Sequence, residues 1–296
     1  MIDPVRYRVT HETRYRYDGP ATASRQRAHL IPRQTPWQHL LSHDFSVSPQ
    51  PCERWIEIDP FGNSVHRFSI EAPHEALLVR ARSEVRVGAG AAWDCIAGCD
   101  FDWQQARRPQ RTALGDIDLE IELCRVGSLR APVLAEAAGY AGVSFGTGRG
   151  WLESMLDLNA RIHCDFAYDR GSTTVGTPVI DLLKSRRGVC QDFAHLMISA
   201  LRSIGLPARY VSGYIFSEGT GQSRVGGHAS HAWVASHAPG YGWVAFDPTN
   251  AKLAQSEFIT LAWGRDYADV APLRGVMMGR GDQQLSVSVV VDLLAG

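Results

Sequence analysis

The sequence predicts an α+β protein in which an antiparallel β domain, resembling a sandwich, precedes a core of helices and strands. Three observations support this prediction. Residues 5–17 alternate in polarity, helical periodicity begins after residue 128, and alternating segments return after residue 208. We therefore divide the chain into an N-terminal β domain over 1–90, a connector over 91–127 and a core over 128–296 that includes a C-terminal strand.

The first strand is the clearest element of the β domain. One face carries apolar side chains and the other carries arginines, as expected of a half-buried strand; the apolar set is Val5, Tyr7, Val9, Tyr15 and Tyr17. Further strands are expected at about 41–48, 52–58, 64–70 and 77–87, a spacing typical of an antiparallel sandwich. We interpret the arginine face as solvated and not as an anion site, because the chain as a whole is not basic.

Composition bounds the class of protein. The chain has 296 residues, of which 45% are hydrophobic. Its formal net charge is -1, so its overall charge gives no general attraction to nucleic acid or to anionic membranes. It has no run of about 18 apolar residues and no signal-peptide pattern at its start, so we expect a cytoplasmic location without a membrane partner. The six cysteines are scattered, which argues against a disulfide framework. Cys95 and Cys99 have no second pair at metal-ligand spacing.

Helical signals dominate after the connector. Ser128 is a candidate N-cap for a helix over 129–140, a second helix is expected at 150–164, and a short one at about 178–185. A strand is expected over 208–216. The glycine- and serine-rich segment 217–227 reads as a loop that covers a cleft and becomes ordered on substrate binding. A final strand over 285–291 could pair with either the N-terminal or the core sheet.

Cys190 lies where a glycine-containing turn enters an apolar-periodic helix. The helix is predicted to begin at or near Cys190 and to end at Gly205. Unpaired backbone N–H groups and the helix dipole favour a negative charge at that position, so the thiolate form of Cys190 should be favoured. A buried, inert cysteine is the alternative.

A reactive cysteine needs a base, and the base needs an orienting group. His231 begins one predicted strand, and Asp247 ends the next, with a turn at 238–241 between them. Neighbouring antiparallel strands can bring an imidazole and a carboxylate together. We therefore expect Asp247 to accept a hydrogen bond from one ring nitrogen of His231, which leaves the other nitrogen facing sulfur.

Four motifs in this order resemble the core of bacterial transglutaminase-like proteins. They are Gly188-Val189-Cys190-Gln191-Asp192-Phe193-Ala194, the segment 205–214, His231-Ala232-Trp233, and Gly242-Trp243 with Phe246-Asp247-Pro248-Thr249-Asn250. The start and the tail of the chain also resemble such proteins. The resemblance implies a papain/transglutaminase-like core, in which the helix carrying the cysteine packs on an antiparallel sheet. It also implies Cys190 as nucleophile, His231 as base and Asp247 as its partner.

Other polar residues have simpler interpretations. We interpret His195 as a buried core histidine and Asp192 as an acid that caps the helix. A zinc site built from Cys190, His228 and His231 is disfavoured, because neighbouring loop and strand positions direct side chains to opposite sides. No EF-hand loop is present, so the resemblance does not extend to calcium, and no metal or cofactor is expected.

Aromatic side chains are candidates for the walls of a substrate cleft. Trp233, Trp243, Tyr168 and Tyr214 are the candidate substrate-binding residues, and packing in the core is the alternative for each. The expected partner is a protein or peptide substrate, and the oligomeric state is not indicated. The chemistry expected is attack of Cys190 on an amide to give a thioester, which water or an amine then resolves. We favour hydrolysis; amine transfer, and a non-catalytic binding module, are the alternatives.

Overall fold

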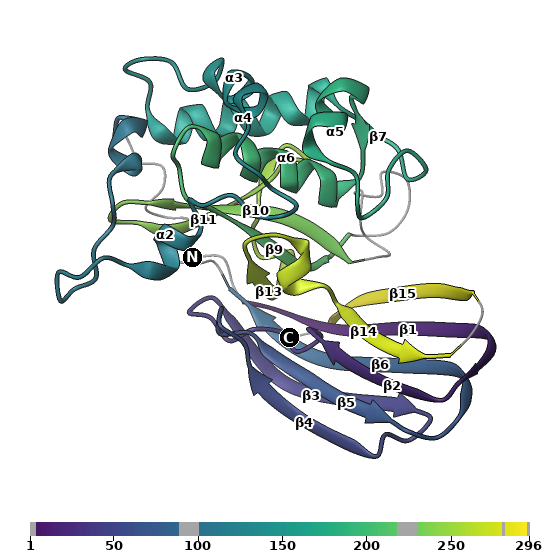
Figure 1. Ribbon diagram of the computed structural model, residues 1–296. Helices are drawn as coiled ribbons and strands as arrows, with labels where there is room; N and C mark the ends of the chain where they lie inside the picture. Colours follow the sequence, from purple (N-terminus) through teal and green to yellow (C-terminus); the bar gives the residue numbers. More distant parts are fainter. Residues whose placement is uncertain (1–3, 89–100, 218–229, 280–281, 295–296) are drawn as a thin grey trace.

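The computed structural model describes residues 4–88, 101–217, 230–279 and 282–294. It has two parts, a β region and a helix-covered core. In Figure 1 the β region lies below the core. The predicted α+β class is confirmed, with an N-terminal antiparallel β region followed by a helix and sheet core.

The β region consists of two four-stranded antiparallel sheets. One has the order β15-β1-β6-β3, with β15 (Gln283–Leu294), β1 (Val5–Ala21), β6 (His74–Val87) and β3 (Gln38–Ser48). The other has the order β14-β2-β5-β4, with β14 (Leu273–Met278), β2 (Ala23–Ala28), β5 (Ser64–Ile70) and β4 (Glu53–Ile58). Phe45 and Phe68 meet between the sheets with ring centroids 6.0 Å apart.

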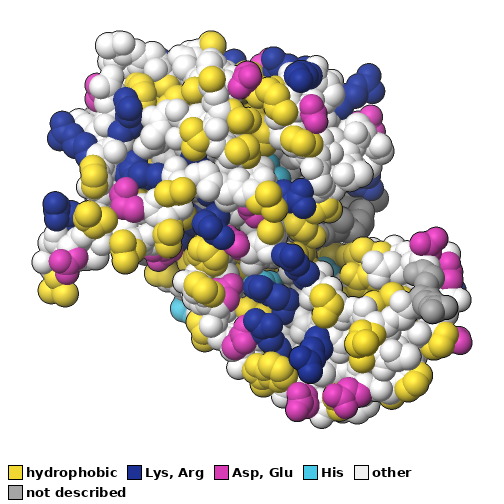
Figure 2. Space-filling view, in the orientation of Figure 1, with side chains coloured by type: hydrophobic (Ala, Val, Ile, Leu, Met, Phe, Trp, Pro, Cys, Tyr) yellow, Lys and Arg dark blue, Asp and Glu magenta, His cyan; other side chains and the backbone are white. Residues whose placement is uncertain are grey.

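The alternation in the first strand has the expected physical result. Tyr7, Val9 and Tyr17 are buried, whereas Arg14 and Arg16 on the opposite face are not. Figure 2 shows further Lys and Arg side chains grouped on the surface of the β region. Arg25, Arg27, Arg67 and Arg274 line a shallow hollow on the second sheet.

The C-terminal segment completes the β region. The final strand, β15, pairs antiparallel with β1, and β14 pairs with β2. The final strand therefore pairs with the N-terminal sheet and not with the core sheet. The predicted division of the chain had instead grouped this strand with the core. Strand pairing depends on contacts between distant segments, and periodicity alone does not specify them.

The core sheet has five strands in the order β12-β11-β10-β9-β13. They are β12 (Lys252–Leu253), β11 (Gly242–Asp247), β10 (His231–Ala238), β9 (Ala208–Ile215) and β13 (Phe258–Gly264). The central helix α6 (Cys190–Ser203) packs on this sheet and is buried along most of its length. Three further helices accompany it, α3 (Ala135–Gly142), α4 (Trp151–Asp165) and α5 (Val179–Ser185).

Three predictions about the core require correction. The helix expected over 129–140 begins only at Ala135, with Leu134 as its N-cap; Pro132 lies in the intervening segment, and the Ser128 hydroxyl instead accepts a hydrogen bond from Arg202. The predicted connector contains the 3-10 helix η1 (Trp103–Arg107) and helix α2 (Leu119–Leu123). Strand β13 (Phe258–Gly264) lies between Asp247 and the final strand, where we predicted no strand.

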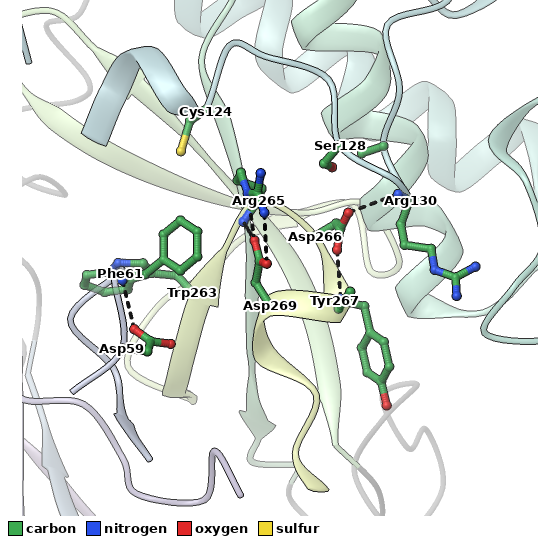
Figure 3. A network of polar contacts seen from close by, with 12 residues as sticks. Asp59, Phe61, Cys124, Ser128, Arg130, Trp263, Arg265, Asp266, Tyr267 and Asp269 are labelled. Atoms are coloured by element: carbon green, nitrogen blue, oxygen red, sulfur yellow. Dashed lines mark hydrogen bonds and ion pairs between the residues drawn. The ribbon is translucent and has the colours of Figure 1, made fainter. Parts of the chain in front are cut away.

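A polar network joins the core to the C-terminal segment. Asp266 caps the short helix α7 (Tyr267–Val270) and accepts a hydrogen bond from the Arg130 backbone N–H at 3.0 Å (Figure 3). Arg265 forms an ion pair with Asp269, 3.0 Å between nitrogen and oxygen (Figure 3). Arg202 of α6 donates to backbone carbonyls of the connector, β9 and the end of β13, so the central helix is bonded to all three.

The β region and the core also contact one another directly. The Tyr214 hydroxyl lies 2.9 Å from Nδ1 of His11, and the Gln38 side chain donates to the Thr260 carbonyl at 2.8 Å. Both pairs are buried. These contacts fix the β region against β9 and β13, the strands next to the candidate site.

Candidate active site

Cys190 is the first residue of α6 and is partly exposed. Strand β7 (Ala167–Tyr168) pairs in parallel with β8 (Arg187–Gly188), immediately before the cysteine. A Cβ atom on Gly188 would lie 2.8 Å from the Leu182 side chain and 3.0 Å from that of Asp192, so a larger residue would displace both. The backbone N–H of Cys190 belongs to the first helical turn, where amides have no acceptor within the helix.

Asp192 caps this turn, as the sequence predicted. Its Oδ2 atom accepts hydrogen bonds from the Val189 backbone N–H at 2.9 Å and from the Thr173 hydroxyl at 2.6 Å. The side chain is buried, and burial raises its pKa. Asp192 therefore connects the loop around Thr173 to the turn that carries Cys190.

His231 and Asp247 meet where β10 begins and β11 ends. Nε2 of His231 donates to Oδ2 of Asp247 at 2.8 Å, and neither side chain is accessible to solvent. The predicted hydrogen bond between these residues is therefore present. The Asp247 carboxylate also accepts from the Thr249 backbone N–H at 2.9 Å and from the Asn250 side chain at 2.6 Å.

These contacts shift both titration equilibria toward the charged forms. Burial by itself would lower the pKa of His231, but the Asp247 carboxylate and, to a smaller extent, Cys190 outweigh it and raise this pKa to about 10. Burial would likewise raise the pKa of Asp247, but the His231 imidazolium and the hydrogen bonds from Asn250 and Thr249 hold it below its usual value. The pair is therefore an imidazolium–carboxylate pair at neutral pH.

The second ring nitrogen of His231 has a different environment. Nδ1 is buried and has no oxygen or nitrogen partner among the described residues. Cys190 interacts with the same imidazole and contributes to its raised pKa. The structure thus brings Cys190, His231 and Asp247 together, in that order.

The four candidate aromatic residues occupy different places. Tyr168 lies beside the turn that precedes Cys190, because it pairs with Gly188, and burial together with Cys190 raises its pKa. Tyr214 is buried and contacts His11 of the β region. The Trp233 ring lies 6.1 Å from the His231 ring.

Trp243 lies on β11, beside the end of β10 that is farther from His231. It is opposite His237, six residues or about 20 Å along the strand from His231. Its ring packs over the guanidinium group of the buried Arg209, whose other face meets Trp263. The structure does not bring Trp243 next to Cys190.

The remaining histidines divide as follows. His195 is buried; it accepts a hydrogen bond from the Tyr267 backbone N–H at 3.2 Å, and burial lowers its pKa to about 4, in agreement with its predicted core role. His228 and the loop segment 218–227 lie outside the described residues. Within the described ranges, no group of three or more His, Cys, Asp or Glu side chains is placed to hold a metal ion.

Sequence reasoning missed Asn250 and Thr173 as supporting residues. Asn250 follows Asp247 in the motif Asp-Pro-Thr-Asn, and its side chain donates to the carboxylate that contacts His231. The motif was part of the resemblance, but nothing in its pattern assigned a partner to the amide. Thr173 belongs to a polar loop with no periodicity, so its contact with Asp192 had no sequence signal.

Comparison with known proteins identifies the class. Residues 7–86 match the family described as Bacterial transglutaminase-like N-terminal region, and residues 147–248 match the Transglutaminase-like superfamily. The fold is shared with the crystal structure of a candidate cysteine protease from Cytophaga hutchinsonii, with a TM-score of 0.77 at 21% identity, covering 99% of this chain and 92% of that one.

Relatives by sequence extend over nearly the whole chain. An uncharacterized protein of Mycobacterium tuberculosis is 37% identical, covering 98% of this chain and 92% of that protein. A protein-glutamine gamma-glutamyltransferase of Pseudomonas aeruginosa is 32% identical over 123 residues, which are 38% of this chain and 18% of that protein. The chain belongs to the transglutaminase-like superfamily. None of the helices in the described ranges is long and apolar enough to span a bilayer.

Proposed function

We propose that the protein is a cysteine-dependent acyl-transfer enzyme that acts on amide bonds of proteins or peptides, with Cys190 as nucleophile, His231 as acid and base, and Asp247 as the group that orients His231. The observation that carries this proposal is the buried His231–Asp247 pair, 2.8 Å between Nε2 and Oδ2, with Nδ1 left for the cysteine. The same order of roles operates in acyl-transfer triads.

The first half-reaction would form a thioester. The Cys190 thiolate attacks the amide carbonyl carbon, and the carbonyl oxygen becomes an oxyanion near the N–H of Cys190 in the first turn of α6. The carbon–nitrogen bond then breaks. The His231 imidazolium gives its proton to the leaving amine, and the acyl group remains on sulfur.

The second half-reaction would release the acyl group. Water or an amine loses a proton to His231 and attacks the thioester carbonyl, and the carbon–sulfur bond breaks to restore the Cys190 thiolate. We favour water, because it is the abundant acceptor, and therefore a peptidase or amidase. Amine transfer is the second candidate, since a gamma-glutamyltransferase is among the relatives.

Alkylation at neutral pH tests the nucleophile without knowledge of the substrate. We expect iodoacetamide to label Cys190 faster than the exposed Cys52 and Cys164, which are controls within the same chain. Peptide mapping by mass spectrometry measures each rate. His231→Ala should slow labelling of Cys190 and leave both controls unchanged.

A peptide library, incubated with and without an added primary amine, tests the reaction. Cleaved peptides indicate hydrolysis, and products whose mass increases by the amine minus ammonia indicate transfer. Cys190→Ala should abolish both products. Equal labelling rates at all three cysteines, together with unchanged peptides, would leave a binding module as the better description.

A further inference from the structure

Strand β15 is an unusual edge of the β region. It is a 12-residue strand at the end of its sheet, with β1 on one side. Its pairing with β1 runs from Gln283 to Leu294 without a register shift. Along its outer side, the strand therefore presents a long, regular row of backbone N–H and C=O groups, which is a template for pairing with another strand.

The side chains of β15 are mostly apolar and about half exposed. The four exposed large ones are Leu285 at 56%, Val287 at 45%, Val290 at 49% and Leu293 at 50%. Asp292 is the one charged residue in the strand. Apart from Asp292, β15 lacks the charges, proline residues and bulges that keep natural sheet edges from pairing.

The opposite edges of the two sheets do carry such features. The pairing of strand β3 is interrupted by a register shift between Leu40 and Ser42. Strand β4 is short and has three charged residues among six. Among the described edge strands of the β region, β15 is therefore the one that is long, regular and low in charge.

We propose that two copies of this chain pair through β15, antiparallel about a two-fold axis at Val289, so that two four-stranded sheets become one continuous sheet. Directly opposed residues in an antiparallel pair point to the same face, and faces alternate along each strand. In a two-fold pair, the axis must therefore pass through a residue and not between two residues.

The sequence around Val289 complements itself in this register. Leu-Ser-Val-Ser precedes Val289, and Val-Val-Asp-Leu follows it. Pairing about Val289 sets Leu285 opposite Leu293 and Val287 opposite Val291 on one face. Asp292 meets Ser286 and not its own copy, so the register opposes no like charges. A second copy of the strand thus covers the exposed leucines and valine with apolar partners.

The mass of the full chain in solution tests the proposal. By light scattering after size exclusion, at micromolar concentration, we expect about twice the chain mass of 32.6 kDa. The double variant Ser288→Lys/Val290→Lys sets lysines opposite one another across the axis and should give the mass of one chain. Ile56→Lys/Ile58→Lys is the matched control, because it places two lysines at exposed positions on the edge strand β4 and should keep the double mass.

Amide hydrogen exchange of the unmodified chain provides a test that does not depend on a variant. In the pair, outward amides of β15 become hydrogen-bonded, so exchange over 283–294 should slow as concentration rises, whereas exchange in β4 should not change. A single-chain mass at micromolar concentration, or a double mass that survives the β15 lysines, would overturn the proposal. So would exchange in β15 that does not depend on concentration.

Discussion

Nε2 of His231 lies 2.8 Å from Oδ2 of Asp247, and water reaches neither side chain. Burial disfavours each charge alone, and each group favours the charged form of the other more than any other neighbour does. The pair therefore has two consequences. It orients the imidazole toward Cys190, and it couples the stability of the fold to pH.

Stability should fall as pH rises above the ordinary titration range of histidine. The pKa of His231 is raised to about 10 in the folded chain, against about 6.5 when unfolded. Its contribution is complete below pH 6.5 and is lost as pH rises toward 10. The free energy of unfolding in urea, measured from pH 6 to pH 10, should show this decline in the native chain.

His231→Gln removes the titrating group and supplies the comparison for that experiment. Its unfolding free energy should be lower at pH 6 and should change less between pH 6.5 and pH 10. Parallel curves for the two proteins would contradict the ion pair. The contribution of Asp247 to stability depends on pH in the opposite direction. Because its pKa is lowered in the folded chain, this contribution is lost as pH falls through the folded pKa.

Asp192→Asn should weaken the turn that carries Cys190. The carboxylate oxygen Oδ2 accepts two hydrogen bonds, from Val189 and Thr173, and an amide accepts them less strongly. We expect a loss of about 1 kcal/mol in unfolding free energy and slower alkylation of Cys190. Asp181→Asn is the control, because this residue is exposed in the first turn of α5, and it should change neither value. Faster alkylation in the Asp192 variant would contradict this role.

Arg209→Leu should destabilise the core by about 2 kcal/mol. The buried guanidinium group lies between the rings of Trp243 and Trp263, 4.1 and 3.8 Å from their centroids, and Nη1 lies 3.0 Å from Glu120. Leucine fills part of the space but loses both ring contacts. Urea unfolding measures the change, with the exposed Arg14→Leu as control. A change below about 0.5 kcal/mol in the Arg209 variant would show that the stacking contributes little.

Local signals predicted the parts of the site that depend on neighbours in sequence. The helix begins at Cys190, as the periodic residues and the preceding glycine indicated. The hydrogen bond between His231 and Asp247 followed from two strands joined by a short turn, so its geometry was predictable. Asp192 as a cap followed from its position in the first turn.

Contacts between distant segments were not predictable in the same way. Tyr214 has an apolar ring and a polar tip, which suit a cleft as well as an interface, and only the packing of β1 on the core reveals its contact with His11. Trp243 shares a short segment with Asp247, yet strand geometry directs it to Arg209. Ser128 has the residue type of a helix cap, but Pro132 follows it and the helix begins only at Ala135. The Ser128 hydroxyl accepts a hydrogen bond from Arg202 instead.

Because β14 and β15 pair with strands of the first two sheets, the helix-covered core is an insertion within a discontinuous β unit. Strand β1 pairs with β15 and strand β2 with β14, and both partners lie after residue 272. These pairs can therefore form only after that part of the chain has been synthesised. A fragment that ends after β6 would leave both of these strands without those neighbours and would tend to self-associate. Assembly of the β unit therefore requires β14 and β15, so its folding depends on completion of the helix-covered core.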